Sequence, residues 1–296
     1  MQWSINLEHV HKSFGQQPVI RDLSLSIPAG SVFALLGENS AGKSTTLKML
    51  TGMLPPTSGR CTVLGLDAWK ESAQLRTRVG YVPEKPRFYD WMTVGELGWF
   101  VAGFHAAGYR SKFQEVIKRF GLQEEASLKH LSKGQYAKVA LALALAQDPE
   151  VLLLDEPTSG LDLFIRREFL GSMVEMAGEG KTILIASHQI AEVERVASHV
   201  GFLAQGQLVL SCTMEELKQK LVRLRLRCEE VPPDVGTLGE ILRFQKQPPF
   251  WEAIIFNPIA SAMQALQNRA DVLDVETASL SLEESYAALL ARKEMR

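Results

Sequence analysis

The sequence predicts an α/β fold organised around a phosphate-binding loop. Over residues 32–50, an apolar run, a glycine-containing loop and a helix-like stretch follow one another. Two further strand-like runs, residues 151–154 and 181–186, end in the polar pairs Asp155-Glu156 and Ser187-His188. Short apolar runs between turn signals are typical of buried strands, and ligands bind at the carboxyl ends of the strands in open α/β sheets. We therefore expect a ligand site at this edge.

Turn and capping residues delimit the other elements of the first part of the chain. A helical insert over about residues 85–147 is rich in aromatic residues, and we expect most of them to form its core and some to form a groove for a partner. These aromatic residues are Phe88, Tyr89, Trp91, Trp99, Phe100 and Phe104. The predicted strands are 3–10, 20–27, 61–64 and 79–82, and the predicted helices are 68–76, 93–108, 112–120, 136–147 and 164–176.

Residues 37–45 contain the phosphate-loop pattern G-x-x-x-x-G-K-[ST] in full. Gly37 and Gly42 allow the backbone to wrap around a phosphate chain, and Lys43 adds positive charge. The hydroxyl of Ser44 then falls where it can ligate a magnesium ion that bridges the outer phosphates. The predicted phosphate contacts are Gly37, Asn39, Ser40, Ala41, Gly42, Lys43, Ser44 and Thr45.

Polar residues at the ends of the other strands complete the candidate site. Two adjacent carboxylates are costly to bury unless they serve an ion or a proton, so we expect Asp155 to hold magnesium and Glu156 to polarise the attacking water. Glu84 leaves strand 79–82 and is either a surface residue or part of the site. His188 is either structural or a ligand contact. Phe14 is either a core residue or a surface for stacking an adenine ring.

Composition restricts the function classes. The chain has 296 residues, 46% of them apolar and 22% charged, which leaves room for two domains in a soluble globular protein. The net charge of −2 gives no general attraction to nucleic acid. Cys61, Cys212 and Cys228 lie far apart, which favours buried free thiols in a reducing compartment. We see neither a secretory signal nor a membrane-spanning stretch, so a membrane function would need another chain to supply the channel.

Together, these motifs resemble the nucleotide-binding subunit of an ATP-binding cassette (ABC) transporter over residues 1 to about 210. The resemblance implies an adenine-stacking role for Phe14, a glutamine-loop role for Glu84 and a switch role for His188. It also implies a signature at 131–135 and a dimer-crossing loop at 159–162. The implied cofactors are ATP and Mg²⁺. The implied catalytic residues are Lys43, Glu156 and His188, the metal ligands are Ser44, Glu84 and Asp155, and the additional nucleotide contacts are Ser132, Gly134, Gln135 and Asp162.

The resemblance also implies partners. Two such domains, identical or related, meet head to tail, and the signature of one closes over the ATP held by the other. The dimer powers a separately encoded multispanning permease, for export rather than import, from the cytoplasmic face of the membrane. No nucleic acid is expected. The alternative is a soluble ABC-type ATPase that acts on ribosomes or nucleic acid. Such proteins commonly carry two nucleotide domains joined by a charged linker, and chromosome-organising relatives carry a long heptad insertion, none of which the sequence shows.

Three positions depart from the family pattern. Glu84 stands where glutamine is usual, Lys133 replaces a glycine of the signature, and Ser40 replaces a glycine of the phosphate loop. A carboxylate can still ligate a hard cation, so the magnesium role of Glu84 survives better than its role in contacting the permease. None of these departures removes the expected catalytic residues, so we expect a competent ATPase.

The tail forms a separate small α+β domain at 213–296, after a nucleotide-binding domain at 1–212. Capping boxes open helices at Thr213 and Ser281. Strand 222–227 carries three alternating arginines, which form either a solvated face or a partner contact. Further strands are expected at 251–256 and 272–275, with a helix at 259–267. Such tails resemble those of ABC proteins that pair with exporter permeases, an inference by analogy.

Overall fold

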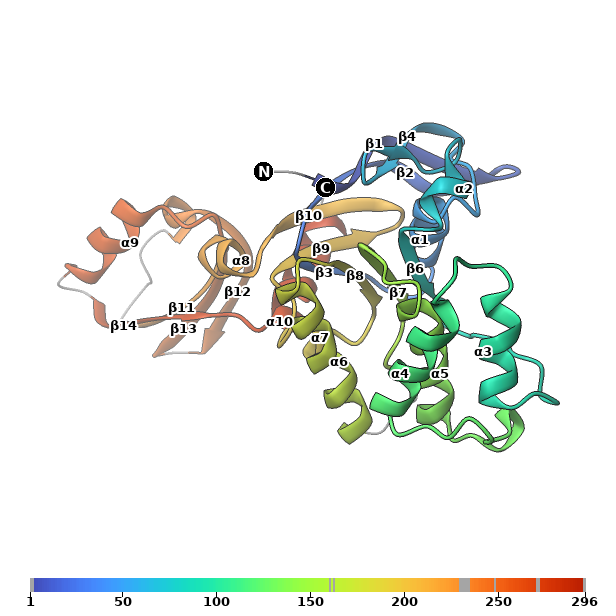
Figure 1. Ribbon diagram of the computed structural model, residues 1–296. Helices are drawn as coiled ribbons and strands as arrows, with labels where there is room; N and C mark the ends of the chain where they lie inside the picture. Colours follow the sequence, from blue (N-terminus) through green and yellow to red (C-terminus); the bar gives the residue numbers. More distant parts are fainter. Residues whose placement is uncertain are drawn as a thin grey trace. The chain divides into compact units, whose positions relative to one another are not determined.

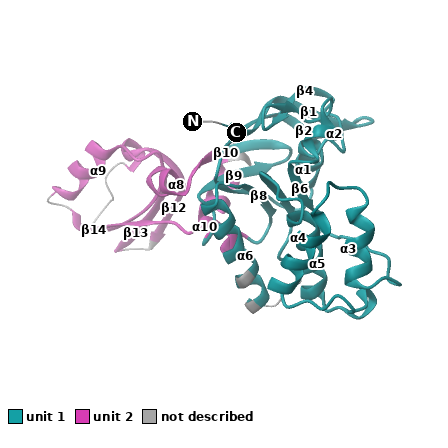
Figure 2. Ribbon diagram, viewed as in Figure 1, with its two compact units in different colours: residues 1–189, 195–210 teal, residues 190–194, 211–296 magenta. Residues whose placement is uncertain are grey.

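The computed structural model describes residues 3–159, 161, 163–228, 235–247, 249–269 and 272–294. It divides into two compact units (Figure 2), each described below by itself. The first comprises residues 1–189 and 195–210, and the second comprises residues 190–194 and 211–296. The short segment 190–194 therefore belongs to the same unit as the tail, although residues 195–210 of the first unit separate the two in sequence.

A central sheet dominates the first unit (Figure 1), and its strand order within the described residues is β10-β9-β3-β8-β7-β6. Pairing is parallel from β9 through β3, β8 and β7 to β6. Every residue of β3 (Val32–Leu36) and of β7 (Val151–Asp155) is buried, as expected for strands covered on both faces. This sheet confirms the predicted α/β fold. Its other strands are β6 (Val79–Val82), β8 (Thr182–Ser187), β9 (His199–Ala204) and β10 (Gln207–Thr213).

Parallel pairing brings three strand ends to one edge of this sheet. β3 ends directly before the phosphate loop, β7 ends at Asp155, and β8 ends at Ser187. β8 lies between β3 and β7. The loop, the two adjacent carboxylates and His188 therefore leave the sheet side by side. Helix α1 (Lys43–Leu50) begins at the end of the loop.

A second, antiparallel sheet in this unit has the order β2-β1-β4-β5 among the described strands. Its apolar side chains share a core with the central sheet, where Ile5, Leu25 and Val63 pack in one cluster with Phe33 and Leu153. This shared core fixes the two sheets of the unit against each other. The strands are β1 (Trp3–Phe14), β2 (Gln17–Pro28), β4 (Ser58–Val63) and β5 (Leu66–Asp67), followed by the short helix α2 (Ser72–Leu75).

The helical insert has a hydrophobic core of its own around Phe113, Ile117 and Val139. Its first helix ends earlier than the predicted 93–108. Beyond Ala102 the backbone continues in tighter i→i+3 turns, and the Gly103 N–H donates to the Phe100 carbonyl (3.2 Å). The α-helix ends here because glycine is a weak helix former. The helices of the insert are α3 (Val94–Ala102), α4 (Tyr109–Arg119), the 3₁₀ turn η1 (Leu128–His130) and α5 (Lys133–Leu145).

The expectation that most aromatic side chains of the insert form its core is wrong. Tyr89, Trp91, Trp99 and Phe104 are 57%, 73%, 63% and 75% exposed. Phe100 is also exposed, and only Phe88 packs against the core. The helical period explains this result, because α3 turns Val94, Leu97 and Gly98 inward and Trp99 and Phe100 outward. We call the exposed residues Tyr89, Trp91, Trp99, Phe100 and Phe104 the aromatic patch.

The first unit also contains α6 (Leu163–Gly178), which follows the dimer-crossing loop expected from the sequence. In the part of the chain that the structure describes, we find no helix with both the length and the apolar character needed to cross a membrane.

The second unit is built on an antiparallel sheet with the order β12-β13-β11-β14 among its described strands. Leu224, Leu226 and Ile255 pack with Leu266 of α9 in one hydrophobic cluster. The strands are β11 (Leu221–Cys228), β12 (Glu240–Gln247), β13 (Phe250–Phe256) and β14 (Val272–Ser279). The helices are α7 (Ile190–Val193), α8 (Met214–Lys220), the 3₁₀ turn η2 (Val235–Leu238), α9 (Ala260–Gln267) and α10 (Leu282–Glu294).

The alternating arginines of β11 lie on a face with acidic neighbours. Arg225 pairs with Glu252 (3.4 Å) and Glu276 (3.8 Å). Arg223 lies 3.8 Å from Glu252 and also pairs with Glu284 of α10. This face of the sheet therefore carries an ion-pair network rather than isolated positive charges.

The three cysteines are buried thiols that form no disulfide with one another, as the sequence predicted. Burial raises the pKa of Cys61 to about 12 and that of Cys212 to about 11. Both thiols therefore stay protonated at neutral pH, which makes them poor nucleophiles.

The substitution of alanine for glycine should have opposite effects on stability at two helical positions. A Cβ at Gly98 would lie 2.3 Å from ring atoms of buried Phe113, whereas a Cβ at Gly171 in α6 would meet no atom within 4 Å. Gly98→Ala should lower the free energy of unfolding by about 1–3 kcal/mol through overpacking. Gly171→Ala should raise it by up to about 1 kcal/mol because alanine favours the helix. Urea unfolding measures both, and a stabilised Gly98→Ala variant would contradict the tight packing of α3 on α4.

Candidate functional site

The phosphate loop depends on its two predicted glycines. Gly42 precedes α1 with a φ of 108°, a conformation that side chains disfavour. A Cβ on Gly37 would lie 2.4 Å from the carbonyl oxygen of Leu203 in β9. Ser40 also has a positive φ, 68°, which explains why glycine is the usual residue there. Serine can adopt this conformation at a cost of about 1–2 kcal/mol.

Lys43 places a buried positive charge inside the loop. Its Nζ donates to the carbonyl oxygens of Gly37 (2.7 Å) and Glu38 (3.2 Å). It also lies 3.2 Å from Oε1 of Glu156. The ammonium group therefore links the loop after β3 to the carboxylate that follows β7.

Ser44 and Asp155 face each other across the same edge. The Ser44 hydroxyl donates to Oδ1 of Asp155 at 2.9 Å. Burial raises the pKa of Asp155, the neighbouring carboxylates of Glu156 and Glu84 raise it further, and the Ser44 hydrogen bond and Lys43 act against the rise. The raised pKa of Asp155 reflects a negative field at this edge, which a divalent cation would relieve.

Glu156 is held by contacts from the end of β8 and from His188, which follows it. Its Oε2 accepts from the His188 N–H (3.2 Å) and from the Ser187 hydroxyl (3.3 Å), and it lies 2.8 Å from Nδ1 of His188. Its backbone has a positive φ of 48°, and its N–H donates to the Ala186 carbonyl (2.9 Å). A non-glycine residue held in this conformation by its surroundings is a mark of functional sites.

The predicted groups line one pocket of about 400 Å³. It brings together the phosphate loop, Glu84, Glu156 and His188 from four separate segments of the chain. Its lining residues are Gln17, Val19, Glu38, Asn39, Ser40, Gly42, Lys43, Ser44, Thr45, Glu84, Glu156 and His188. Most of these lining residues are among those predicted from the sequence, so the spacing of the motifs predicted which segments meet at this pocket.

Several residues near the pocket were not predicted. Gln17 and Val19 line it from β2, and their closeness to Phe14 in the sequence is the only signal that points to them. Phe14 itself is half exposed, with Nζ of Lys12 5.2 Å from its ring centroid.

Tyr81 of β6 also lies close to the acidic groups. Burial, followed by the carboxylate of Asp155, raises the pKa of Tyr81. The Tyr81 phenol therefore stays neutral beside the acidic groups. The only sequence signal for Tyr81 was its place in the strand that precedes Glu84.

The predicted signature residues begin α5. Ser132 and Gln135 form a complete capping box, in which the Gln135 N–H donates to the Ser132 hydroxyl (3.2 Å) and the Ser132 N–H donates to the Gln135 side chain (2.9 Å). Gly134 is buried and Lys133 is exposed. Lys133 lines a second pocket, of about 320 Å³, together with Glu84 and Glu156. Asp162 lies outside the described residues.

The chain matches a known protein family over the segment that carries most of these motifs. The family model described as "ABC transporter" matches residues 20–159. The linearmycin resistance ATP-binding protein LnrL of Bacillus subtilis is 32% identical over 71% of its own length and 73% of this chain. The chain belongs to the ABC transporter family. This ABC protein is also 32% identical to the bacitracin transport ATP-binding protein BcrA of Bacillus licheniformis, over 73% of that protein and 74% of this chain.

Other relatives are longer. The probable multidrug ABC transporter ATP-binding protein YbhF of Escherichia coli is 36% identical over 72% of this chain, and the match spans 38% of YbhF. The names of these relatives support the transporter interpretation better than the soluble alternative.

Solved structures agree on the fold. The ATP-binding subunit of an ABC transporter matches 72% of this chain and 91% of its own, with a TM-score of 0.66 and 27% identity. The protein cbiO1 of Clostridium perfringens, described as part of the ABC transporter complex cbiONQ, matches 73% and 91% with a TM-score of 0.65 and 28% identity. The chain therefore has the fold of an ABC ATPase cassette.

Replacing Asp155 or Asp148 by asparagine should change stability in opposite directions at neutral pH. The pKa of Asp155 is raised above its ordinary 3.8 by burial, so the charged form costs stability at neutral pH. Without nucleotide, Asp155→Asn should be more stable than the parent chain at pH 7. The gain should fade as the pH falls through the raised pKa, because both folded and unfolded chains are protonated below 3.8.

Asp148 is the control. Its pKa is lowered by hydrogen bonds from Lys181 and Lys112, so its charged form contributes stability above 3.8 that is lost on acidification. Asp148→Asn should therefore be less stable at pH 7. Urea unfolding across this pH range measures both differences, and equal signs for the two variants would contradict a net cost of burying the Asp155 carboxylate.

Proposed function

We propose that this chain is the ATP-binding and ATP-hydrolysing subunit of an ABC transporter and that it powers a separately encoded membrane permease. The observation that carries the proposal is the pocket in which the phosphate loop, Glu84, Glu156 and His188 meet. The relatives named for multidrug, bacitracin and linearmycin resistance functions support export as the direction.

The loop is suited to hold a triphosphate. Its backbone N–H groups and the N-terminus of α1 favour negative charge, and Lys43 supplies a fixed ammonium group. Phosphate oxygens can replace the carbonyl oxygens that Lys43 contacts. The adenine ring would stack on Phe14, beside Gln17 and Val19 of the pocket wall.

Ser44 and Asp155 fit a magnesium ion. Both present hard oxygen donors, they lie 2.9 Å apart, and Mg²⁺ is commonly held by one or two carboxylates together with substrate phosphates. Among the described residues, no group of three or more His, Cys, Asp or Glu side chains could hold a metal ion by itself. We propose Glu84 as the third protein ligand. When bound, the ion would neutralise charge that develops on the phosphate oxygens.

Glu156 is suited to act as the general base. Its Oε2 is held by His188 and Ser187, and its Oε1 faces Lys43. A carboxylate fixed in this way can orient a water molecule for in-line attack and accept its proton. His188 fixes the position of that carboxylate and can donate to the transferred phosphate, while Lys43 stabilises the negative charge of the transition state.

The signature supports a dimer. Ser132 and Lys133 lie exposed at the start of α5, a helix of 13 residues. Its N-terminus can neutralise an anion. We propose that two cassettes, identical or related, meet head to tail, so that Ser132, Gly134 and Gln135 of one close over the phosphates held by the other. Asp162 would contribute from the dimer-crossing loop.

The aromatic patch supports a protein partner. Four of its rings form a chain of contacts, with centroids 5.8 Å apart for Tyr89 and Trp91, 6.3 Å apart for Tyr89 and Phe100, and 5.5 Å apart for Phe100 and Phe104. Phe88 and Val101, which neighbour patch residues in sequence, line a groove of about 390 Å³. Apolar helices dock in grooves of this kind. We propose that a cytoplasmic helix of the permease docks on the aromatic patch and the neighbouring groove. This contact would hold the chain at the inner face of the membrane.

Glu156→Gln should separate ATP binding from hydrolysis. The variant keeps the volume of the side chain and loses the proton acceptor, so ATP binding should persist while turnover falls by about a hundredfold or more. Phosphate release and binding of a fluorescent ATP analogue measure the two properties. Glu179→Gln is the control and should leave both unchanged, because Glu179 is an exposed residue directly after α6. Near-normal turnover of Glu156→Gln would refute its role as the base.

Trp99→Ala should weaken the permease contact without changing ATP binding. Removing an anchor tryptophan from an interface typically costs more than 1 kcal/mol, so permease recovered with the tagged chain from detergent-solubilised membranes should fall by about tenfold. Trp69→Ala is the control, because Trp69 is also exposed and lies outside the patch. Equal recovery with both variants, or crosslinks that map the permease elsewhere, would exclude this docking site.

A further inference from the structure

The segment that follows His188 belongs to the second unit. After His188 and Gln189 the chain enters α7, and residues 190–194 group with the tail rather than with the ATPase unit. The chain returns to the first unit at Arg195. Residues 190–194, which begin two positions after His188, therefore belong to the accessory part of the protein.

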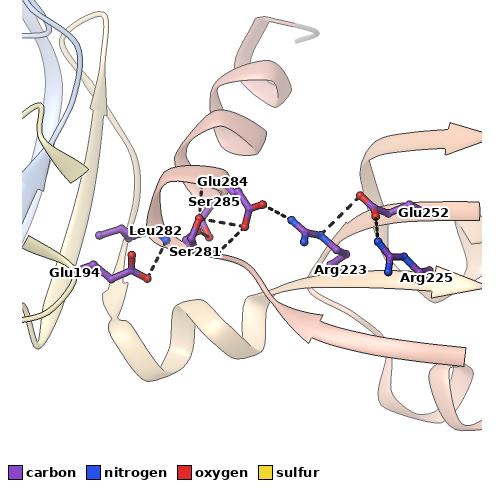
Figure 3. A network of polar contacts seen from close by, with 8 residues as sticks. All are labelled: Glu194, Arg223, Arg225, Glu252, Ser281, Leu282, Glu284 and Ser285. Carbon is purple, nitrogen blue, oxygen red and sulfur yellow. Dashed lines mark hydrogen bonds and ion pairs between the residues drawn. The ribbon is translucent and has the colours of Figure 1, made fainter. Parts of the chain in front are cut away.

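Helix α7 packs against α10 within this second unit. Ile190 and Val193 of α7 are buried, and so is Leu282 at the start of α10. A polar contact joins the same two segments, because Oε1 of Glu194 accepts a hydrogen bond from the backbone N–H of Leu282 at 3.1 Å (Figure 3). A carboxylate at a helix N-terminus satisfies an otherwise unpaired N–H and interacts favourably with the helix dipole.

The N-terminus of α10 is itself held by the sheet of the second unit. Ser281 and Glu284 cap each other, with the Ser281 N–H donating to Glu284 (3.0 Å) and the Glu284 N–H donating to the Ser281 hydroxyl (3.2 Å). Glu284 also pairs with Arg223 of β11 (Figure 3). The Ser281 N–H and then Arg223 lower the pKa of Glu284, so it stays charged at neutral pH. The polar network therefore continues from the sheet to Glu194.

His188 is held on its other side by the catalytic carboxylate. Both its backbone N–H and its Nδ1 lie within 3.2 Å of Oε2 of Glu156. Only residues 189–193 separate this anchor from Glu194. A short segment held at both ends transmits a displacement of one end to the other, because it contains little slack.

We propose that Glu194 is a positioning residue through which the second unit sets the placement of His188, and with it the rate of ATP hydrolysis. This inference rests on the proposed role of His188. It gives the accessory unit a task inside the catalytic cycle: rearrangement of its sheet or of α10 changes the hold on α7 and thereby tunes turnover.

Glu194→Ala removes the acceptor for the Leu282 N–H, whereas Glu194→Gln keeps an oxygen in its place. In the purified full chain, Glu194→Ala should lower kcat by about two- to tenfold, the equivalent of one lost hydrogen bond. KM for ATP should not change, because the phosphate loop is not involved. Glu194→Gln should restore kcat. Glu283→Ala is the matched control, since it removes a carboxylate from the same first turn of α10 and leaves the Glu194 contact in place.

A direct measurement of the surroundings of the His188 side chain tests whether the Glu194 contact influences its placement. The imidazole carbon–proton resonances of the six histidines can be recorded by NMR, and His188→Ala assigns the peak of His188. That peak should shift in Glu194→Ala, return in Glu194→Gln and stay in place in Glu283→Ala. An unshifted peak, or an unchanged kcat, in a folded Glu194→Ala variant would overturn the inference.

His188→Ala also separates the two levels of the argument. If it keeps wild-type turnover, the proposed catalytic role of His188 fails, and the inference about Glu194 fails with it. If it loses turnover while Glu194→Ala does not, only the inference about Glu194 fails.

Discussion

The compensation of buried charge at one edge of the central sheet is the constraint on which the rest of the site depends. Lys43, Asp155 and Glu156 are 6%, 2% and 8% exposed. Isolated charges are costly at such depth. The fold meets this constraint by pairing β3, β8 and β7 in parallel, so that one ammonium group and the facing carboxylates emerge side by side. The single lysine does not balance the negative charge, which is why burial and like charge together raise the pKa of Asp155. A site of this kind is stabilised by what it binds, and the binding of nucleotide with its metal completes the charge balance of the fold.

Those features that are encoded locally could be predicted from the sequence. β3, β7 and β8 are buried along their whole length, so their apolar runs are continuous. The capping boxes at Thr93, Ser132 and Thr213 each have both of their hydrogen bonds, because a cap depends only on residues three positions apart. The phosphate loop was predicted for the same reason, since its spacing is a property of one short segment.

Features set by contacts between distant segments were missed. The pairing of Lys43 with Glu156 and the approach of Tyr81 to Asp155 require the strand order, which the sequence does not state. The aromatic residues of the insert were placed in its core on composition alone, although the period of α3 turns Trp99 and Phe100 outward. The grouping of 190–194 with the tail had no local signal, because α7 is too short for a periodic pattern and its partner α10 lies near the far end of the chain.

Under the docking proposal, the aromatic patch also governs what happens to a copy of this chain that finds no permease. Such a copy keeps Trp91, Trp99 and Phe104 in water, and clusters of exposed rings promote non-specific association and recognition by chaperones and proteases. Unassembled subunits would be removed or rescued more often than assembled ones. The amount of this protein in the cell would therefore follow the amount of its membrane partner, and the balance between the two would be set by the surface of the subunit rather than by matched synthesis.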